Sequence, residues 1–363
     1  MLWLFLWQSV HFFVQALAIL VVGALLYTLF FSQEVRPMPS KKTVLAQAFV
    51  DLGNATLNLY HRRVDESDYW ERLEFASVVS TDALVATHPE RITVNSTDYL
   101  VGEVAASLHC DKTGATDSGK VANALPLVIY GLSQAFGIEA PLNVDVVFTC
   151  PSVKAYGDDI TKQLVGEHTI TLPGDDFAMI ESQTQTITIR VAKAQLEGYQ
   201  AYRLVKKDCP NGAVLIDLGS RTAIATVVDA KGRIISRNPK DECGCHNIID
   251  RIHKAECLVG FDGLESRLPD AKQIMTFLLS EQKTSIRKKQ IQAITPHIMA
   301  GVQDQISFAR QYDDKPIYLL GGGALLPGIA DIFSNGHQKA AVMPDPTWAN
   351  LMGLSMVADK IFK

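Results

Sequence analysis

The order of apolar and polar positions along the chain predicts an α/β fold. Short apolar runs typical of strands occupy residues 43–50, 142–149, 186–191, 213–216 and 316–320. Between them, apolar positions recur with helical period over residues 122–135, 247–257, 285–312 and 347–362. Strands that alternate with helices indicate a sheet covered by helices, as in α/β domains.

Two segments of the chain repeat the same pattern. Residues 44–59 and 213–228 each contain an apolar strand, Asp-Leu-Gly, a short polar turn and a second apolar strand. Glycine allows a tight turn with positive φ and lets backbone amides approach an anion. The preceding carboxylates, Asp51 and Asp217, are placed to bind a hydrated divalent metal beside that anion. One such turn usually marks an ordinary hairpin, but two at equivalent places predict a pair of loops that bind one polyphosphate.

A third glycine element comes after the strand-like run 316–320. It reads Gly321-Gly322-Gly323-Ala324 and leads into a helical stretch. A glycine-rich turn from strand to helix offers backbone N–H groups and the positive end of the helix to a nucleotide. A loop crowded by neighbouring backbone would explain these glycines alone. Their order after the two hairpins favours nucleotide binding.

The first residues of the chain differ from the rest. Residues 1–32 contain no charged side chain, and about 20 apolar residues suffice for a helix to cross a bilayer. We therefore expect a transmembrane helix over 1–32 and a polar linker over 33–42. The basic residues Arg36, Lys41 and Lys42 favour a cytoplasmic location for the rest of the chain. A cleaved signal peptide fits poorly, because a basic start and a cleavage site are missing; a buried core helix and a start site upstream of the true one remain alternatives.

Composition narrows the function classes further. With 363 residues the chain is long enough for two domains, and its net charge of −5 gives no basic face for nucleic acid. Six cysteines in a chain of this size do not suggest a disulfide framework, so we expect a reducing compartment. Five sulfur and imidazole side chains that could bind zinc or an iron–sulfur centre cluster in the sequence, but their spacing matches no standard zinc motif: Cys243, Cys245, His246, His253 and Cys257. Residues 114–121 resemble a P-loop, except that Val121 lacks the hydroxyl that would bind magnesium. Lys120 is therefore expected to begin a helix.

Taken in order, these motifs resemble the actin-like ATPase superfamily, and within it the ParM/StbA type of bacterial actin homologue. Residues 51–59 and 217–225 resemble its two phosphate loops, and residues 320–324 its adenosine loop; residues 99–103, 142–152 and 349–354 match further family stretches in the same order. The resemblance covers residues 43–360. It implies a duplicated, ribonuclease H-like fold with two lobes and a nucleotide cleft, lobe I at 43–205, lobe II at 206–345, and a C-terminal helix at 346–363 that returns to lobe I.

The resemblance also implies a site for ATP and Mg²⁺ between the lobes. Asp51 and Asp217 would bind the metal, and Glu197 would orient the attacking water, although Leu196 stands where the family has proline. A solvated glutamate is the alternative reading of Glu197. The positions expected to contact the nucleotide are Gly53, Asn54, Ala55, Thr56, Asn58, Gly219, Ser220, Arg221, Thr222, Gly321, Gly322, Gly323 and Ala324.

Three departures from the family pattern bear on activity. Asn58 stands where the family often has a phosphate-facing lysine, and Ser220 replaces a glycine. Arg221 is a candidate to restore the missing charge. Unchanged ATP affinity in an Arg221→Ala variant would rule out this hypothesis.

We expect a membrane-tethered actin-like ATPase that self-associates head-to-tail into filaments, in plasmid segregation or a cytoskeletal role. The alternative is a non-hydrolysing, membrane-bound scaffold or sensor that changes its lobe angle on binding nucleotide.

Overall fold

The computed structural model describes residues 43–64, 69–82, 85–108, 113–114, 117–138, 140–174, 181–258, 271–279, 287–334 and 338–362. The predicted transmembrane helix and linker, 1–32 and 33–42, lie outside these residues. Within the described part of the chain, no helix combines the length and the apolar character needed to span a membrane.

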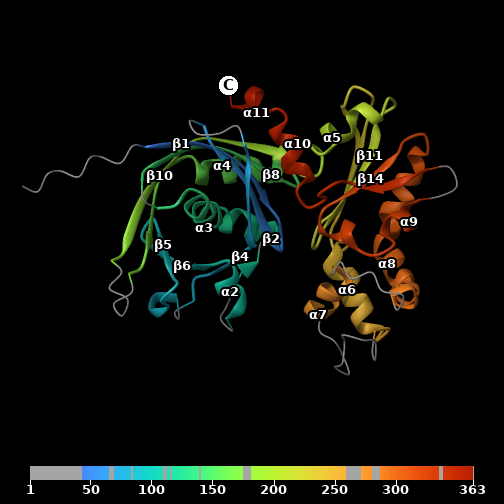
Figure 1. Ribbon diagram of the computed structural model, residues 1–363, viewed down its shortest axis with the longest axis horizontal. Helices are drawn as coiled ribbons and strands as arrows, with labels where there is room; N and C mark the ends of the chain where they lie inside the picture. Colours follow the sequence, from blue (N-terminus) through green and yellow to red (C-terminus); the bar gives the residue numbers. More distant parts are fainter. Residues whose placement is uncertain are drawn as a thin grey trace, which may run out of the picture. The chain divides into compact units, whose positions relative to one another are not determined.

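The first sheet contains ten described strands (Figure 1), in the order β3-β2-β1-β8-β10-β9-β5-β6-β4-β7. Strand β1 pairs antiparallel with β2 and parallel with β8, which in turn pairs parallel with β10. The strands are β1 (Val44–Leu52), β2 (Thr56–Arg63), β3 (Glu71–Ala76), β4 (Val78–Ser80), β5 (Ile92–Val94), β6 (Thr97–Val101), β7 (Thr113–Gly114), β8 (Leu142–Cys150), β9 (Gly166–Leu172) and β10 (Gln183–Leu196). Strand β10 is longer than the predicted run 186–191, because it pairs with β9 as well as with β8.

The second sheet repeats the first in a shorter form. Its five described strands run β13-β12-β11-β14-β15, with β11 antiparallel to β12 and parallel to β14. This order and these directions match β3-β2-β1-β8-β10, so the duplication predicted from the two Asp-Leu-Gly hairpins extends over five strands. The strands are β11 (Ala213–Leu218), β12 (Ala223–Val228), β13 (Ile234–Lys240), β14 (Ile317–Leu320) and β15 (Ala340–Val342).

Each sheet carries its own core and its own helices. Helix α3 (Asp117–Phe136) buries Leu127, Val128 and Leu132 in the core of the first sheet. Helices α6 (Cys245–Lys254) and α8 (Arg287–Ala309) share the core of the second sheet. The remaining described α-helices are α2 (Glu103–Ser107), α4 (Asp158–Leu164), α5 (Tyr202–Val205), α7 (Ala271–Leu279) and α9 (Ile329–Phe333). Helix α3 begins at Asp117, three residues before the start expected at Lys120.

The C-terminal segment packs against the first sheet. Helices α10 (Ala349–Ser355) and α11 (Ala358–Ile361) replace the single helix predicted over 347–362, because Val357 leaves the helical region at φ −124°. Leu351 and Leu354 pack with Phe49 of β1 and Val147 of β8.

A small motif joins α10 to the segment between the sheets. The Asn350 side-chain oxygen accepts a hydrogen bond from the backbone N–H of Gln200 at 3.2 Å. A Cβ at Gly353 would lie 2.0 Å from the Gln200 carbonyl oxygen. The Ala-Asn-x-x-Gly pattern at 349–353 is thus explained by one hydrogen bond and one close backbone approach.

Candidate functional site

Three predicted site carboxylates meet where the two sheets face each other. Asp51 lies near the end of β1, Asp217 near the end of β11, and Glu197 directly after β10. Gly198 brings Glu197 close to Asp217, since a Cβ at Gly198 would lie 2.9 Å from Asp217 Oδ2. The negative charge of Glu197 raises the pKa of both aspartates. Residues far apart in the sequence therefore form one acidic centre.

Burial and repulsion between the carboxylates raise the pKa of both aspartates in the acidic centre. Burial, and then repulsion by Glu197, raise the pKa of Asp51 from 3.8 to about 6. A hydrogen bond from the Thr149 hydroxyl to Asp51 Oδ1, at 2.7 Å, works in the opposite direction. Burial also raises the pKa of Asp217, helped by Glu197 and Asp51. A cation bound here would relieve this repulsion.

Lys120 reaches the acidic centre from the first turn of α3, a role that was not predicted from the sequence. It is 3% exposed, and its Nζ lies 3.6 Å from Glu197 Oε2. The signal was present in the Gly-Lys pair of the P-loop-like stretch 114–121, but Val121 has no hydroxyl, and a lysine at the start of a helix explained the pair equally well.

Arg237 of β13 is a second unexpected cation. Its guanidinium donates to the Pro151 carbonyl at 2.6 Å and to the Glu197 carbonyl at 3.1 Å. It therefore joins the second sheet to the ends of β8 and β10. The sequence of β13 carries no motif that would have identified it.

The two phosphate-loop glycines are required for a different reason from the one predicted. Neither Gly53 nor Gly219 has a positive φ. Instead, a Cβ would lie 2.4 Å from the Thr56 carbonyl oxygen at Gly53, and 3.0 Å from the Thr222 carbonyl oxygen at Gly219. The turn at Gly53 closes too tightly for a side chain, and the equivalent turn at Gly219 brings the corresponding carbonyl oxygen into a tight contact.

The first predicted phosphate loop contains buried polar atoms without a hydrogen-bond partner among the described residues. The side-chain oxygens of Asn54 and Asn58 are buried and have no hydrogen-bond partner among the described residues. Asn58 pairs in register with Asp51 across the β1–β2 hairpin, which puts both side chains on one face of the sheet. Thr56 is partly exposed and Ala55 exposed. Buried acceptors of this kind usually bind water or a ligand.

The second phosphate loop is fixed by the start of α6. Backbone N–H groups of Gly244, Cys245 and His246 donate to the carbonyls of residues 221, 219 and 220, at 3.0, 2.9 and 2.7 Å. Ser220 and Thr222 are partly exposed. The exposed side chain of Arg221 makes no hydrogen bond or ion pair within the described part of the chain. The cation that contacts the acidic centre from the first sheet is Lys120. The role suggested for Arg221, to restore positive charge near the phosphates, stays a prediction.

The cysteines of the candidate metal cluster have a structural explanation, because they contribute to the core of the second sheet. Cys245 is buried in the core of the second sheet, and Cys243 and Cys257 pack against that core. Among the residues that the structure describes, no three His, Cys, Asp or Glu side chains are grouped so that they could hold a metal ion. A metal at Asp51 and Asp217 would therefore need water or phosphate oxygens as further ligands.

The adenosine-loop glycines have two different surroundings. Gly321 has φ +80°, and a Cβ there would lie 2.5 Å from Asp217 Oδ1. At Gly323 a Cβ would lie 2.8 Å from the Cβ of Leu218, and the adjoining Ala324 is buried. At Gly322 no atom lies within 4 Å of the added Cβ. Crowding therefore accounts for the outer two glycines, and Gly322 faces open space.

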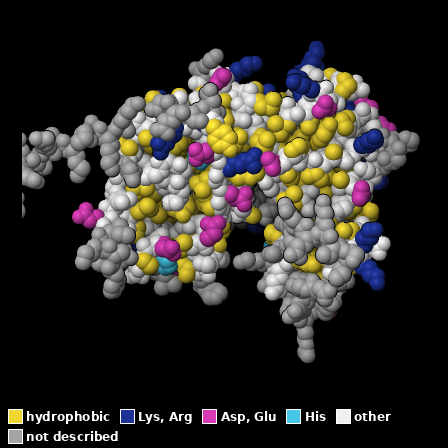
Figure 2. Space-filling view, viewed as in Figure 1, with side chains coloured by type: hydrophobic (Ala, Val, Ile, Leu, Met, Phe, Trp, Pro, Cys, Tyr) yellow, Lys and Arg dark blue, Asp and Glu magenta, His cyan; other side chains and the backbone are white. Residues whose placement is uncertain are grey.

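The space-filling view shows a hollow in this region. The surface in Figure 2 is recessed between the part built on the first sheet and the part built on the second, and acidic side chains lie along its edge.

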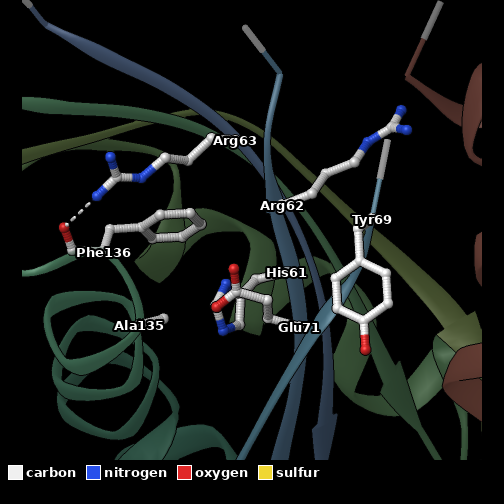
Figure 3. Close-up of a pocket in the computed structure, with 7 residues that line it drawn as sticks. All are labelled: His61, Arg62, Arg63, Tyr69, Glu71, Ala135 and Phe136. Atoms are coloured by element: carbon white, nitrogen blue, oxygen red, sulfur yellow. Dashed lines mark hydrogen bonds between the residues drawn. The ribbon is translucent and has the colours of Figure 1, made fainter. Parts of the chain in front are cut away.

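A separate cavity of about 170 Å³ lies at the other end of β2 (Figure 3). His61, 4% exposed, packs edge-on against Phe136 with ring centroids 5.0 Å apart, and burial lowers the pKa of its imidazole. The Arg63 guanidinium turns to the Phe136 carbonyl oxygen at 3.2 Å. Since β2 begins at the first phosphate loop and ends here, this cavity is distinct from the acidic centre.

Comparisons with known proteins support the architecture. No protein-family model and no curated protein matches the sequence. Among solved structures, the archaeal actin homologue Ta0583 has a TM-score of 0.62 at 17% identity, covering 88% of this chain and 100% of its own. The actin-like protein Alp7A has 0.61 at 15%, covering 88% and 98%. Bacillus thuringiensis ParM with ATP has 0.59 at 15%, covering 88% and 100%. The chain has an actin-like fold.

That fold confirms the α/β, two-sheet architecture expected from the resemblance. Ta0583 has also been solved in complex with ADP, and a ParM from Clostridium botulinum has been solved as a filament. Identities this low show the fold alone, so any activity of this chain has to be argued from its own residues.

Proposed function

We propose that this protein is an actin-like ATPase that binds ATP and Mg²⁺ between its two sheets. One observation carries the proposal: Asp51, Glu197 and Asp217 converge from the ends of β1, β10 and β11, and burial and mutual repulsion raise the pKa of both aspartates. Three carboxylates meet two cations here, Lys120 and Arg237, and burying a charge without a partner is costly. A metal–phosphate complex explains why they are kept.

The residues present fit a magnesium ion. Asp51 and Asp217 would hold it through water, which suits an ion that keeps much of its hydration shell. When bound, Mg²⁺ would neutralise phosphate charge. The chain itself would supply the other functions. The loops at Gly53 and Gly219 lie where backbone amides can face the phosphates, and Gly322 leaves space for the rest of the nucleotide.

Glu197 is the residue proposed to act on water. Its carboxylate would accept a hydrogen bond from the water that attacks the γ-phosphorus. The new bond joins the water oxygen to phosphorus as the bond to the β–γ bridging oxygen breaks, and the products are ADP, inorganic phosphate and a proton. Glu197→Gln should retain ATP binding and lose most turnover.

A second function has one specific observation in its favour. Lys120 Nζ lies 3.6 Å from the Glu197 carboxylate, so the water-orienting group is engaged by a cation in this structure. A protein that kept this arrangement with ATP bound would be a non-hydrolysing scaffold or sensor. Phosphate release and light scattering of the full-length protein in detergent, with ATP and with ADP, separate the two. Phosphate release with ATP-dependent scattering supports the filament-forming ATPase; tight ATP binding without either supports the scaffold.

Self-association and membrane tethering complete the proposal. The actin-like fold and the filament formed by the C. botulinum ParM support head-to-tail assembly, with plasmid segregation or a cytoskeletal role as the setting. The uncharged sequence 1–32 supports a membrane tether, and the basic residues that follow it, Arg36, Lys41 and Lys42, favour a cytoplasmic location for the actin-like part. Alkaline extraction of membranes should leave the full-length protein in the pellet and release a variant without residues 1–32. Release of both would refute the tether.

A further inference from the structure

The first phosphate loop lacks the cation that a polyphosphate site needs. Position 58, directly opposite Asp51 in the β1–β2 hairpin, holds an asparagine. A phosphate lying against this loop would meet Asp51 and two amide side chains, and an amide carries no positive charge. Some other part of the chain must supply that charge if ATP is to bind tightly.

Lys120 is placed to supply it. Its side chain is 2% exposed, and it lies 3.6 Å from a Glu197 side chain that is itself only 13% exposed. The charge of Lys120 lowers the pKa of Asp51 and of Asp217, so it faces the whole acidic centre. A buried ammonium with three donors on a flexible stem is a suitable ligand for a phosphate oxygen.

We propose that Lys120 takes the place of the missing lysine and binds the terminal phosphate of ATP, leaving Glu197 as it does so. This inference rests on the proposed function, because it concerns the same nucleotide site. ADP lacks the γ-phosphate, so with ADP bound Lys120 remains on Glu197. With ATP the ammonium moves to the phosphate, and the Glu197 carboxylate becomes available to the attacking water.

The proposal explains why the stretch 114–121 resembles a P-loop without being one. In a P-loop, the lysine and the magnesium-binding hydroxyl are adjacent in sequence. Here the lysine stands at the start of α3, Val121 comes next, and the candidate magnesium ligands Asp51 and Asp217 come from two other strands. The cation is therefore contributed by a helix of the first sheet.

The test compares ATP with ADP. Lys120→Met keeps the length of the side chain and removes its charge. In calorimetric titration of the full-length protein, this variant should bind ATP about 10–100-fold more weakly than the parent, as expected for loss of a charge-assisted hydrogen bond. Its affinity for ADP should change less than about 3-fold. Lys162→Ala is the matched control, since Lys162 lies in α4 with its side chain 77% exposed. Equal losses for ATP and ADP, or no loss, would overturn the proposal.

Two further variants distinguish a specific loss of ATP binding in Lys120→Met from misfolding of that variant. Asn58→Lys added to Lys120→Met should restore part of the ATP preference, because it returns a cation to the position opposite Asp51. Glu197→Gln should tighten ATP binding, because it weakens the competitor for Lys120. Failure of both, with folded protein by circular dichroism, contradicts the proposal. If the parent protein binds neither nucleotide, the proposed function and this inference are both refuted. If the parent prefers ATP over ADP and Lys120→Met prefers ATP to the same degree, only this inference is refuted.

Discussion

Replacing Asp51 with asparagine should stabilise the protein at neutral pH while it weakens nucleotide binding. Asp51 is held beside Glu197 in protein surroundings that raise the pKa of its carboxyl to about 6. Its ionised form is therefore disfavoured in the folded state. An amide has nearly the same shape, carries no charge, and can still accept the hydrogen bond from the Thr149 hydroxyl.

The magnitude comes from the shift in this pKa. The difference between 3.8 and about 6 corresponds to about 3 kcal/mol at 1.36 kcal/mol per unit. Because the folded-state pKa is raised, the folded protein binds the proton more tightly; this contribution to stability is complete below pH 3.8 and is lost as the pH rises through about 6. Asp51 keeps some exposed surface, so water screens part of the repulsion and we expect about 1–3 kcal/mol.

Urea unfolding of the parent and of Asp51→Asn at pH 4 and at pH 7 measures the effect. The variant should be more stable than the parent at pH 7, and the gap should close at pH 4. Saturating ATP with Mg²⁺ should raise the stability of the parent and not that of the variant. Asp145→Asn is a matched control on β8, where the carboxylate pairs with Arg190 at 2.8 Å; it should destabilise by up to about 1 kcal/mol. An Asp51→Asn variant less stable than the parent at pH 7 would show that the acidic centre is not repulsive.

Three further predictions concern the backbone and the contacts between the sheets. Gly353→Ala should destabilise by more than about 2 kcal/mol in urea unfolding, because its Cβ would lie 2.0 Å from the Gln200 carbonyl oxygen; near-parent stability would contradict that packing. Gly322→Ala should leave stability within about 0.5 kcal/mol, because nothing lies within 4 Å of the added Cβ, but it should weaken ATP binding in calorimetry; unchanged affinity would place the nucleotide elsewhere. Arg237→Ala should lower stability by about 1–3 kcal/mol, because two carbonyls lose their donor, and an unchanged unfolding midpoint would show that water replaces it.

Much of the architecture could be predicted because its signals are local. The strands β1, β8, β11 and β14 coincide with apolar runs of the right length, and the two hairpins coincide with Asp-Leu-Gly turns. Continuous apolar runs and glycine in tight turns are local features of the sequence. The same local order placed Asp51 and Asp217 at strand ends, and the tertiary structure brings the two carboxylates close enough for Asp51 to raise the pKa of Asp217.

The sequence shows where glycine occurs, but it does not show why glycine is required there. The Asp-Leu-Gly turns suggested positive φ at Gly53 and Gly219, but the structure shows a carbonyl oxygen close to where a Cβ would be, nearer at Gly53 than at Gly219. Both reasons select glycine, so the residue type alone cannot separate them. Likewise, the triple glycine at 321–323 combines crowded positions with one open position, and only the packing against Leu218 distinguishes them.

Lys120 and Arg237 depended entirely on the tertiary structure. One stands at the start of a helix and the other on an edge strand, and each reaches Glu197 through the way distant elements pack. The sequence by itself determined the paired hairpins, the glycine turns and the acidic strand ends, because short-range sterics and periodicity encode them. Which cations face those carboxylates was decided only by the fold, because the partner of a buried charge is set by long-range packing.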